Sequence, residues 1–117
     1  MRKFIYSLDD FSGYEKLRGM PMVYVLTTFD FKYTKIGIAK NIKQRMSNIQ
    51  NGCPFTLSLY LGAHAPNVRE IEKYLHDYFS DKNIRGEWFC FNDEDIDKLL
   101  DFFSALNNEV KKSFRGR

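Results

Sequence analysis

Two short apolar segments separated by four residues constrain this chain more than any other feature. MVYVLTT (Met22 to Thr28) is rich in β-branched and aromatic residues, and YTKIGIA (Tyr33 to Ala39) alternates between two sets of side chains. The connection FDFK is too short to carry a crossover helix. The two segments are therefore predicted to form an antiparallel hairpin, around which the rest of the chain must pack.

A helix is predicted directly after the hairpin. Asn41 is a favourable N-cap residue, and Gly52 and Pro54 supply the stop signals. Between them an apolar stripe recurs at i, i+4 and i+7, formed by Ile42, Met46 and Ile49. The spacing predicts an amphipathic helix packed against the hairpin.

FTLSLYLG, which follows this helix, has the alternation of a half-buried strand. Its apolar positions are Phe55, Leu57, Leu59 and Leu61, separated by Thr56, Ser58 and Tyr60. We expect this segment to join the hairpin in a three-stranded sheet.

The second half of the chain predicts two more helices and one short strand. NVREIEKYLHDYF begins at an Asn67 cap and carries the apolar stripe Val68, Ile71, Leu75 and Tyr78 or Phe79. GEWFCF predicts a short strand or extended segment, with Trp88 and Phe89 in the core. NDEDIDKLLDFFSALNNEVKK predicts a capped helix with acidic residues in its first turn, where they complement the helix dipole.

The predicted order is β-β-α-β-α-β-α, an α/β protein of the α+β type. We expect a small, mostly antiparallel three-stranded sheet flanked by helices, within one domain of 117 residues. Residues 1–21 are expected to form an appendage, residues 22–91 the core, and residues 92–117 a C-terminal helix and tail. The sequence lacks the G-x-G-x-x-G and P-loop patterns of nucleotide-binding crossovers.

Charge is distributed unevenly along the chain. The formal net charge is only +3, but no acidic residue lies between Asp30 and Glu70. The basic residues of that interval are Lys32, Lys35, Lys40, Lys43, Arg45 and Arg69. This pattern indicates either a solvated basic face or the footprint of a polyanion, and Lys32, Lys40, Lys43 and Arg69 are the candidate DNA contacts.

Other properties exclude several classes of protein. An apolar fraction of 44% with 11 Phe and 7 Tyr is unlike a disordered chain. Cys53 and Cys90 are too far apart to suggest a zinc site or a disulfide framework. No stretch resembles a signal peptide or a membrane span, so we expect a cytoplasmic location, in a bacterium or a bacterial host, and no membrane partner.

Four pieces of the sequence, in this order, resemble the GIY-YIG nuclease superfamily: VYVL, KIG, NIKQRM and EIEKYLH. GIAKNIKQRM is similar to the excision-repair branch of that superfamily. KIG, EKYLHDYF and RGEWF are more similar to the branch typified by a bacteriophage T5 reading-frame domain, which is common in phages and mobile elements. The resemblance covers Met22 to Phe91.

The resemblance implies a metal-dependent endonuclease that hydrolyses DNA phosphodiester bonds with one Mg²⁺ or Mn²⁺ ion. Tyr24, Gly37, Arg45 and Glu72 occupy the four positions of the superfamily pattern. By this resemblance Glu72 would hold the metal. Arg45 would bind the scissile phosphate, a role that suits a guanidinium at the flank of an apolar stripe.

The general base is left open by departures from the pattern. Lys35 replaces the second tyrosine of the superfamily, Met22 replaces its first glycine, and Ile38 stands where the excision-repair branch has lysine. Tyr24 as the base would need positive charge nearby to form a phenolate at neutral pH, and Lys35 and Arg45 are the candidates for that charge. Alternatively, Lys35 is itself the base.

Glu72 lies beside the apolar stripe of its helix, where an ionised carboxylate is costly unless it is paired or metal-bound. The structural alternatives to metal binding are a hydrogen bond to His76 and an ion pair with Arg69. Gly37, His76 and Glu87 are expected to support the site. The asparagine found late in the superfamily has two loose counterparts here, Asn83 and Asn92.

Two alternatives to the nuclease remain at this stage. The chain could be a DNA-binding module with weak or no cleavage, or a viral interaction protein built on the same scaffold. A single small domain would also need a homodimer or a protein partner for targeting.

Overall fold

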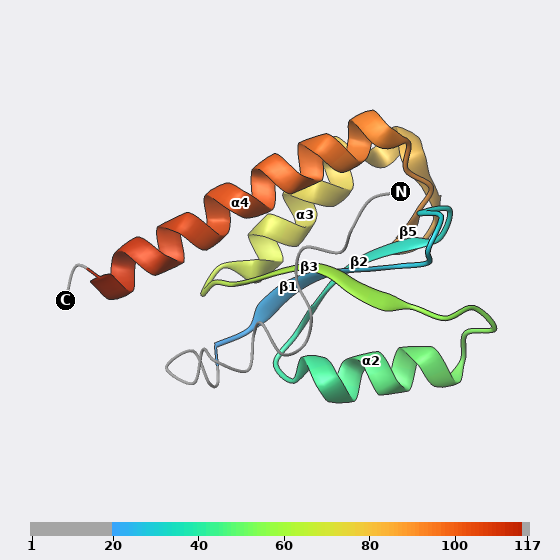
Figure 1. Cartoon of the computed structure of the whole chain (residues 1–117), viewed down its shortest axis with the longest axis horizontal. Coiled ribbons are helices and arrows are strands. Elements are labelled where there is room, and N and C mark those ends of the chain that lie inside the picture. Colours follow the sequence, from blue (N-terminus) through green and yellow to red (C-terminus); the bar gives the residue numbers. More distant parts are fainter. Residues whose placement is uncertain (1–19, 116–117) are drawn as a thin grey trace.

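The computed structural model describes the backbone of residues 20–115 and the side chains of residues 20–107. The predicted appendage, residues 1–21, therefore lies outside the described residues except for its last two. The described chain folds as one sheet with helices on both faces (Figure 1).

The sheet has five strands in the order β3-β1-β2-β5-β4, all paired antiparallel. The bounds are β1 Met22–Thr27, β2 Thr34–Ala39, β3 Ser58–His64, β4 Asn83–Arg85 and β5 Trp88–Phe89. The predicted hairpin and its pairing with β3 are confirmed. The predicted number of three strands is wrong, because β5 pairs with β2 and β4 then pairs with β5. Strand β4 is three exposed residues long and carries no apolar periodicity that could have predicted it.

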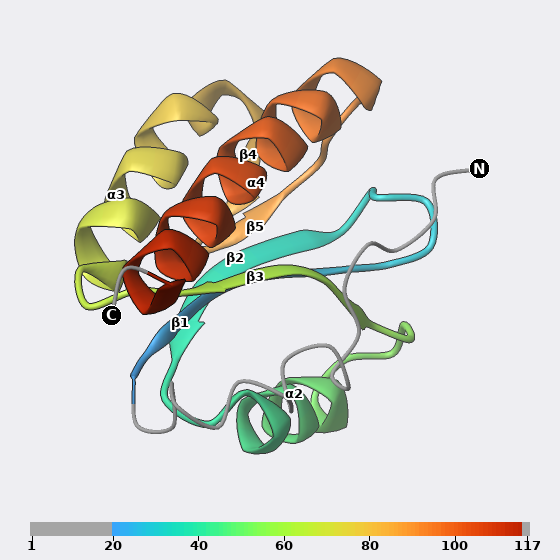
Figure 2. The same ribbon diagram turned by 60° about the vertical axis from the view of Figure 1, so that its left-hand side comes forward.

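In the described part of the chain, three helices cover the sheet (Figures 1 and 2). Helix α2 (Ile42–Asn51) lies on one face, and α3 (Val68–Tyr78) and α4 (Asp93–Arg115) lie together on the other. A 3₁₀ turn, η2 (Ser80–Lys82), follows α3. Within the described chain, none of the helices combines the length and the apolar character that crossing a membrane requires.

The strand register divides the core into two layers. Met22, Tyr24 and Leu26 of β1 pack with the α2 stripe, whereas Val23 and Val25 pack with α3 and α4. The predicted stripe Ile42, Met46 and Ile49 is confirmed as the contact of α2 with this core. A sheet covered on both faces buries successive residues of its strands, whichever way they point.

The predicted alternation in β3 is wrong for this reason. Leu59 through Ala63 are all buried, and Tyr60 is as inaccessible as its neighbours. The pairing passes from Val25–Leu61 to Leu26–Leu59, so Tyr60 is the extra residue of a β-bulge. The strand begins only at Ser58, and Phe55 lies in the preceding loop with half of its surface exposed.

Two of the three predicted helix caps are formed by side chains. Asn41 Oδ1 accepts a hydrogen bond from the Gln44 amide, 3.1 Å long. Asn92 and Asp95 accept reciprocally from each other's amides and make a capping box. Asn67 occupies the N-cap position of α3, but its side chain makes no capping hydrogen bond, so that prediction is wrong in its mechanism. The α3 stripe is confirmed, with Phe79 buried and Tyr78 exposed.

Candidate active site

Gly37 on β2 is the point around which the candidate site is built. It pairs with Tyr24 of β1, and both face the α2 side of the sheet. A Cβ atom at Gly37 would lie 2.5 Å from Tyr24 Oη and 2.8 Å from Glu87 Oε1. The phenol and the carboxylate therefore both lie against the bare Cα of Gly37, and glycine is required here by close approach.

Gly37→Ala is expected to lower the free energy of unfolding by about 1–3 kcal/mol, the usual cost of overpacking. The added methyl would collide with the Tyr24 ring, which is fully buried and cannot swing aside. Gly52→Ala is the matched control, because a Cβ there meets only the Ile49 carbonyl, at 4.0 Å. Urea unfolding of both variants measures the difference. Equal stability of the two would contradict the packing described for Gly37.

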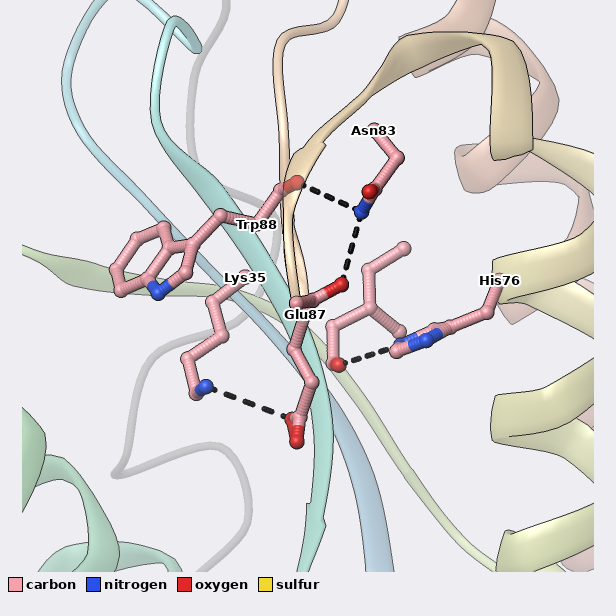
Figure 3. A network of polar contacts seen from close by, with 7 residues as sticks. Lys35, His76, Asn83, Glu87 and Trp88 are labelled. Carbon is pink, nitrogen blue, oxygen red and sulfur yellow. Dashed lines mark hydrogen bonds and ion pairs between the residues drawn. The ribbon is translucent and has the colours of Figure 1, made fainter.

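Glu87 is placed by a tight turn between β4 and β5. Gly86 takes a φ of +56°, a conformation that glycine adopts without strain. The Asn83 side-chain amide donates to the carbonyls of Gly86 and Trp88, at 2.8 and 3.1 Å, and so clamps the turn (Figure 3). The Ile36 amide donates to the Glu87 carbonyl at 3.1 Å. Three hydrogen bonds thus fix Glu87 beside β2.

Lys35 is held by two neighbours on the same side of the sheet. Its Nζ lies 3.4 Å from Glu87 Oε1 and 5.4 Å from the centre of the Trp88 ring (Figure 3). Only 12% of its side chain is exposed, so the ion pair is better protected from water than a surface pair. Trp88 is half-buried and covers Lys35, and the prediction that it belongs to the core is therefore only partly right.

Tyr24 carries its hydroxyl into the buried centre of this group. Among the described residues no partner satisfies the hydroxyl with full hydrogen-bond geometry. Burial raises its pKa, the adjacent Arg45 guanidinium lowers it, and Glu87 and Glu72 raise it further, so that the pKa of Tyr24 is raised overall. Lys35 and Arg45 were the candidates for the positive charge that would lower this pKa. Burial and two carboxylates outweigh Arg45, and Lys35 is paired with Glu87 instead.

Arg45 approaches the same hydroxyl from α2. The pKa of Arg45 is raised, first by Tyr24 and then by Glu87. The residue is nevertheless exposed, so its guanidinium faces both the buried phenol and solvent. A cation in this position is available to an anionic ligand.

Glu72 reaches the site from α3, on the opposite face of the sheet from α2. Burial raises the pKa of Glu72, and the Glu87 carboxylate raises it further, against the opposing charges of His76, Lys35 and Arg69. Neither structural alternative for Glu72 is formed among the described residues: it has no ion pair with Arg69, and His76 Nε2 donates to the Ile36 carbonyl at 2.9 Å. Glu72 is therefore a partly desolvated carboxylate that also feels the negative charge of Glu87, and the opposing charges compensate it only in part.

The two layers meet here because the edge of β2 is only partly covered. β5 pairs with β2 at Thr34 and Lys35, and one further backbone hydrogen bond joins the Ile36 amide to the Glu87 carbonyl. Beyond that point side chains from α3 and from the α2 face can approach one another around the strand. We call Tyr24, Lys35, Arg45, Glu72 and Glu87 the Gly37 cluster; the four predicted catalytic residues all belong to it.

The candidate DNA contacts separate into groups. Lys40 and Arg69 line one pocket of about 460 Å³, beside Ile38 and Ala39, which follow Gly37 on β2. Lys43 is exposed on α2, and Lys32 is exposed in the β1–β2 turn at the other end of β2. The pocket places two of the four next to the Gly37 cluster, although Glu70 also lines it.

Glu87 has more contacts and electrostatic effects in the site than its sequence position indicated. We expected it to support the site, but it contacts Gly37 and Lys35 and perturbs Tyr24, Arg45 and Glu72. Its only sequence signal is its place in RGEWF. The two loose asparagines lie elsewhere, since Asn83 clamps the β4–β5 turn and Asn92 caps α4.

The fold and the Gly37 cluster together define a small α+β domain of the GIY-YIG-like kind, with tyrosine, arginine and glutamate gathered at one strand edge. The sequence model of the T5orf172 domain matches residues 22–104, and the chain belongs to that nuclease-related family. The match confirms the branch indicated by KIG and RGEWF, and it runs beyond Phe91 into α4. Neither a curated protein nor a solved structure matches this chain.

Proposed function

We propose that this protein is a metal-dependent endonuclease that hydrolyses DNA phosphodiester bonds at the Gly37 cluster. The observation that carries the proposal is the convergence of Arg45, Glu72 and Glu87 on Tyr24 from three different elements. A nuclease must place positive charge on the phosphate and hold a water beside it. The nuclease-related family gives the same class of function.

The carboxylates fit a divalent metal ion. The Glu87 carboxylate raises the pKa of Glu72, and Glu72 is also partly desolvated, so a nearby positive charge would stabilise its ionised form. Among the described residues, no three histidine, cysteine or acidic side chains are grouped so that they could hold a metal ion together. Two carboxylates suit Mg²⁺ or Mn²⁺, since Mg²⁺ keeps several of its waters. The ion would supply charge that stabilises the phosphate and activates water.

Arg45 is the group proposed to bind the scissile phosphate. Its guanidinium can offer two parallel N–H donors to phosphate oxygens, and the exposed position leaves it accessible. Lys40 and Arg69 in the neighbouring pocket would bind the adjacent DNA backbone.

Tyr24 and Lys35 take different roles in this proposal. The raised pKa keeps Tyr24 a neutral phenol at pH 7, so it would orient the attacking water by hydrogen bonding. Lys35 is engaged by Glu87 and Trp88, and it would hold the carboxylate of Glu87 in place. Because Lys35 is already paired with Glu87, we propose Tyr24 rather than Lys35 as the group that orients the attacking water.

The test is incubation of the purified protein with supercoiled plasmid in Mg²⁺, in Mn²⁺ and in EDTA. We expect nicked and linear products with either metal and none in EDTA. DNA binding is measured in parallel by anisotropy at 50 and 200 mM salt. Salt-sensitive DNA binding without cleavage products under any condition would instead identify a DNA-binding module. If the protein neither bound nor cut DNA, an interaction protein on the same scaffold would be the remaining alternative.

A further inference from the structure

A second cluster of side chains lies at the hairpin end of β2. Tyr33 and Phe55 are 41% and 47% exposed, and their rings stack with centroids 4.9 Å apart and an interplanar angle of 9°. Tyr33 comes from the β1–β2 hairpin and Phe55 from the loop between α2 and β3. Both segments project at the same end of the sheet (Figures 1 and 2). We call the two residues the aromatic pair.

The aromatic pair is held in place before any ligand arrives. The Thr28 amide donates to the Tyr33 carbonyl at 3.1 Å, which continues the hairpin pairing past the end of β2. On the other side, Gln50 Nε2 donates to the Phe55 carbonyl at 2.8 Å, and Gln50 Oε1 accepts from the Leu57 amide. Two anchored backbones therefore present parallel rings to solvent, and little conformational entropy remains to be lost on binding.

The aromatic pair continues the face of the Gly37 cluster. Lys35 and Gly37 are alternate residues of β2 and share the α2 face of the sheet. Tyr33 directly precedes β2, and its ring stacks on Phe55 from the loop that follows α2. Gly37 is four positions after Tyr33, which is about 13 Å along an extended chain. Trp88 lies beside Lys35 between the two sites. Along β2, this face therefore carries first the aromatic pair, then Lys35, and then the proposed phosphate site at the Gly37 cluster.

The charge at this end permits an anionic strand. Lys32 is exposed beside Tyr33. The nearby acid, Asp30, accepts hydrogen bonds from Thr28 Oγ1 at 2.8 Å and from the Lys32 amide at 3.1 Å. Phe29, 65% exposed, adds a third aromatic side chain to the turn. Stacked aromatic rings combined with basic residues are the usual surface for unpaired bases.

We propose that the aromatic pair stacks an unpaired base of a DNA strand whose backbone runs along β2 to the Gly37 cluster. This inference rests on the proposed function and narrows its substrate class to DNA with a single-stranded segment beside the cleavage site. Bases inside an intact duplex stack on one another and offer no free face to a protein ring. A flap or a splayed end offers such a face.

The test uses protein carrying Glu72→Gln, in EDTA, so that no strand is cut. Anisotropy measures affinity for three labelled DNAs of shared sequence: a single strand, a duplex with a flap, and a blunt duplex. We expect the first two to bind roughly ten-fold more tightly than the blunt duplex. Adding Tyr33→Ala or Phe55→Leu should weaken flap binding by about ten-fold and change blunt-duplex binding less than about two-fold.

Tyr78→Ala is the matched control, because Tyr78 is an exposed aromatic residue on α3 that also stacks on a neighbouring ring, that of Tyr74. It should leave all three affinities unchanged. Thermal unfolding of each variant identifies any loss that reflects misfolding, and Tyr33→Phe, which keeps the ring, should bind the flap as the parent does.

Equal affinity for flap and blunt duplex, or flap affinity unaffected by both aromatic substitutions, overturns the inference. These outcomes do not depend on cleavage. A protein that nicks plasmid but shows no aromatic dependence keeps the nuclease proposal and loses this one. A protein whose flap binding depends on the aromatic pair but which cuts no DNA keeps this inference and loses the nuclease proposal.

Discussion

Glu72→Gln is expected to reduce metal-dependent nicking by at least about 10³-fold, because the substitution removes the negative charge that would attract the ion. Glutamine has nearly the shape of glutamate, so packing on α3 is preserved. The matched control is Asp77→Asn on the same helix, an exposed acid paired with Lys73 and remote from the Gly37 cluster. Initial nicking rates at saturating Mg²⁺ measure both variants.

The same substitution has a second effect that does not require catalysis. The pKa of Glu72 is higher in the folded chain than its ordinary value, so the folded state binds this proton more tightly. Stability is therefore lost as pH rises from the ordinary pKa through the raised one. Glu72→Gln removes that loss and should raise Tm relative to the parent at pH 7, with no gain at pH 3.

Metal binding should appear in the same melting curves. Mg²⁺ or Mn²⁺ bound only by the folded state raises Tm. The parent should show this rise at pH 7, and the Glu72→Gln variant should not. Nicking that survives in the variant, together with an unchanged metal response, would remove Glu72 from the proposed metal site.

Arg45→Ala is expected to lower the nicking rate by about 10²–10³-fold, the usual cost of removing one donor that stabilises transition-state charge. Arg45→Lys should recover only part of the loss, because an ammonium cannot make two parallel hydrogen bonds to a phosphate. The alanine variant also loses the one neighbour that lowers the pKa of Tyr24. Rates over a pH series separate this effect from phosphate binding.

Lys43→Ala is the control for Arg45, since Lys43 is exposed on the same helix. Loss of a backbone contact should weaken DNA binding and reduce its salt dependence, while the rate at saturating DNA stays close to that of the parent. If Arg45→Ala behaved like Lys43→Ala, Arg45 would be a DNA contact with no part in the chemistry.

Much of the site could be predicted from sequence because its residues lie on locally encoded elements. Tyr24 and Gly37 belong to a hairpin defined by two apolar segments and a short turn. Arg45 follows a cap at Asn41 and lies beside a stripe of period 3.6. The T5orf172 match supports the branch to which these motifs point.

The sequence did not predict the surroundings of these residues. Glu87 has no periodicity to place it, and its position depends on β5 pairing with the edge of β2. Tyr60 was assigned by alternation, which fails in a sheet covered on both faces. Phe55 was assigned to the same strand, but the strand begins only at Ser58. The pKa of Tyr24 depends on burial and on three charges brought by three separate elements.

The sequence by itself determined the hairpin and the helices, because turn chemistry, capping and side-chain period act over a few neighbouring positions. The resemblance to the superfamily, and not these local signals, indicated Tyr24, Gly37, Arg45 and Glu72. Only the tertiary structure decided that α2 and α3 cover opposite faces, that their charged side chains meet around Gly37, and that Tyr33 stacks on Phe55. These outcomes depend on contacts between residues far apart in the chain. Which strand edge stays open, and which charges become buried there, is fixed only when the layers pack.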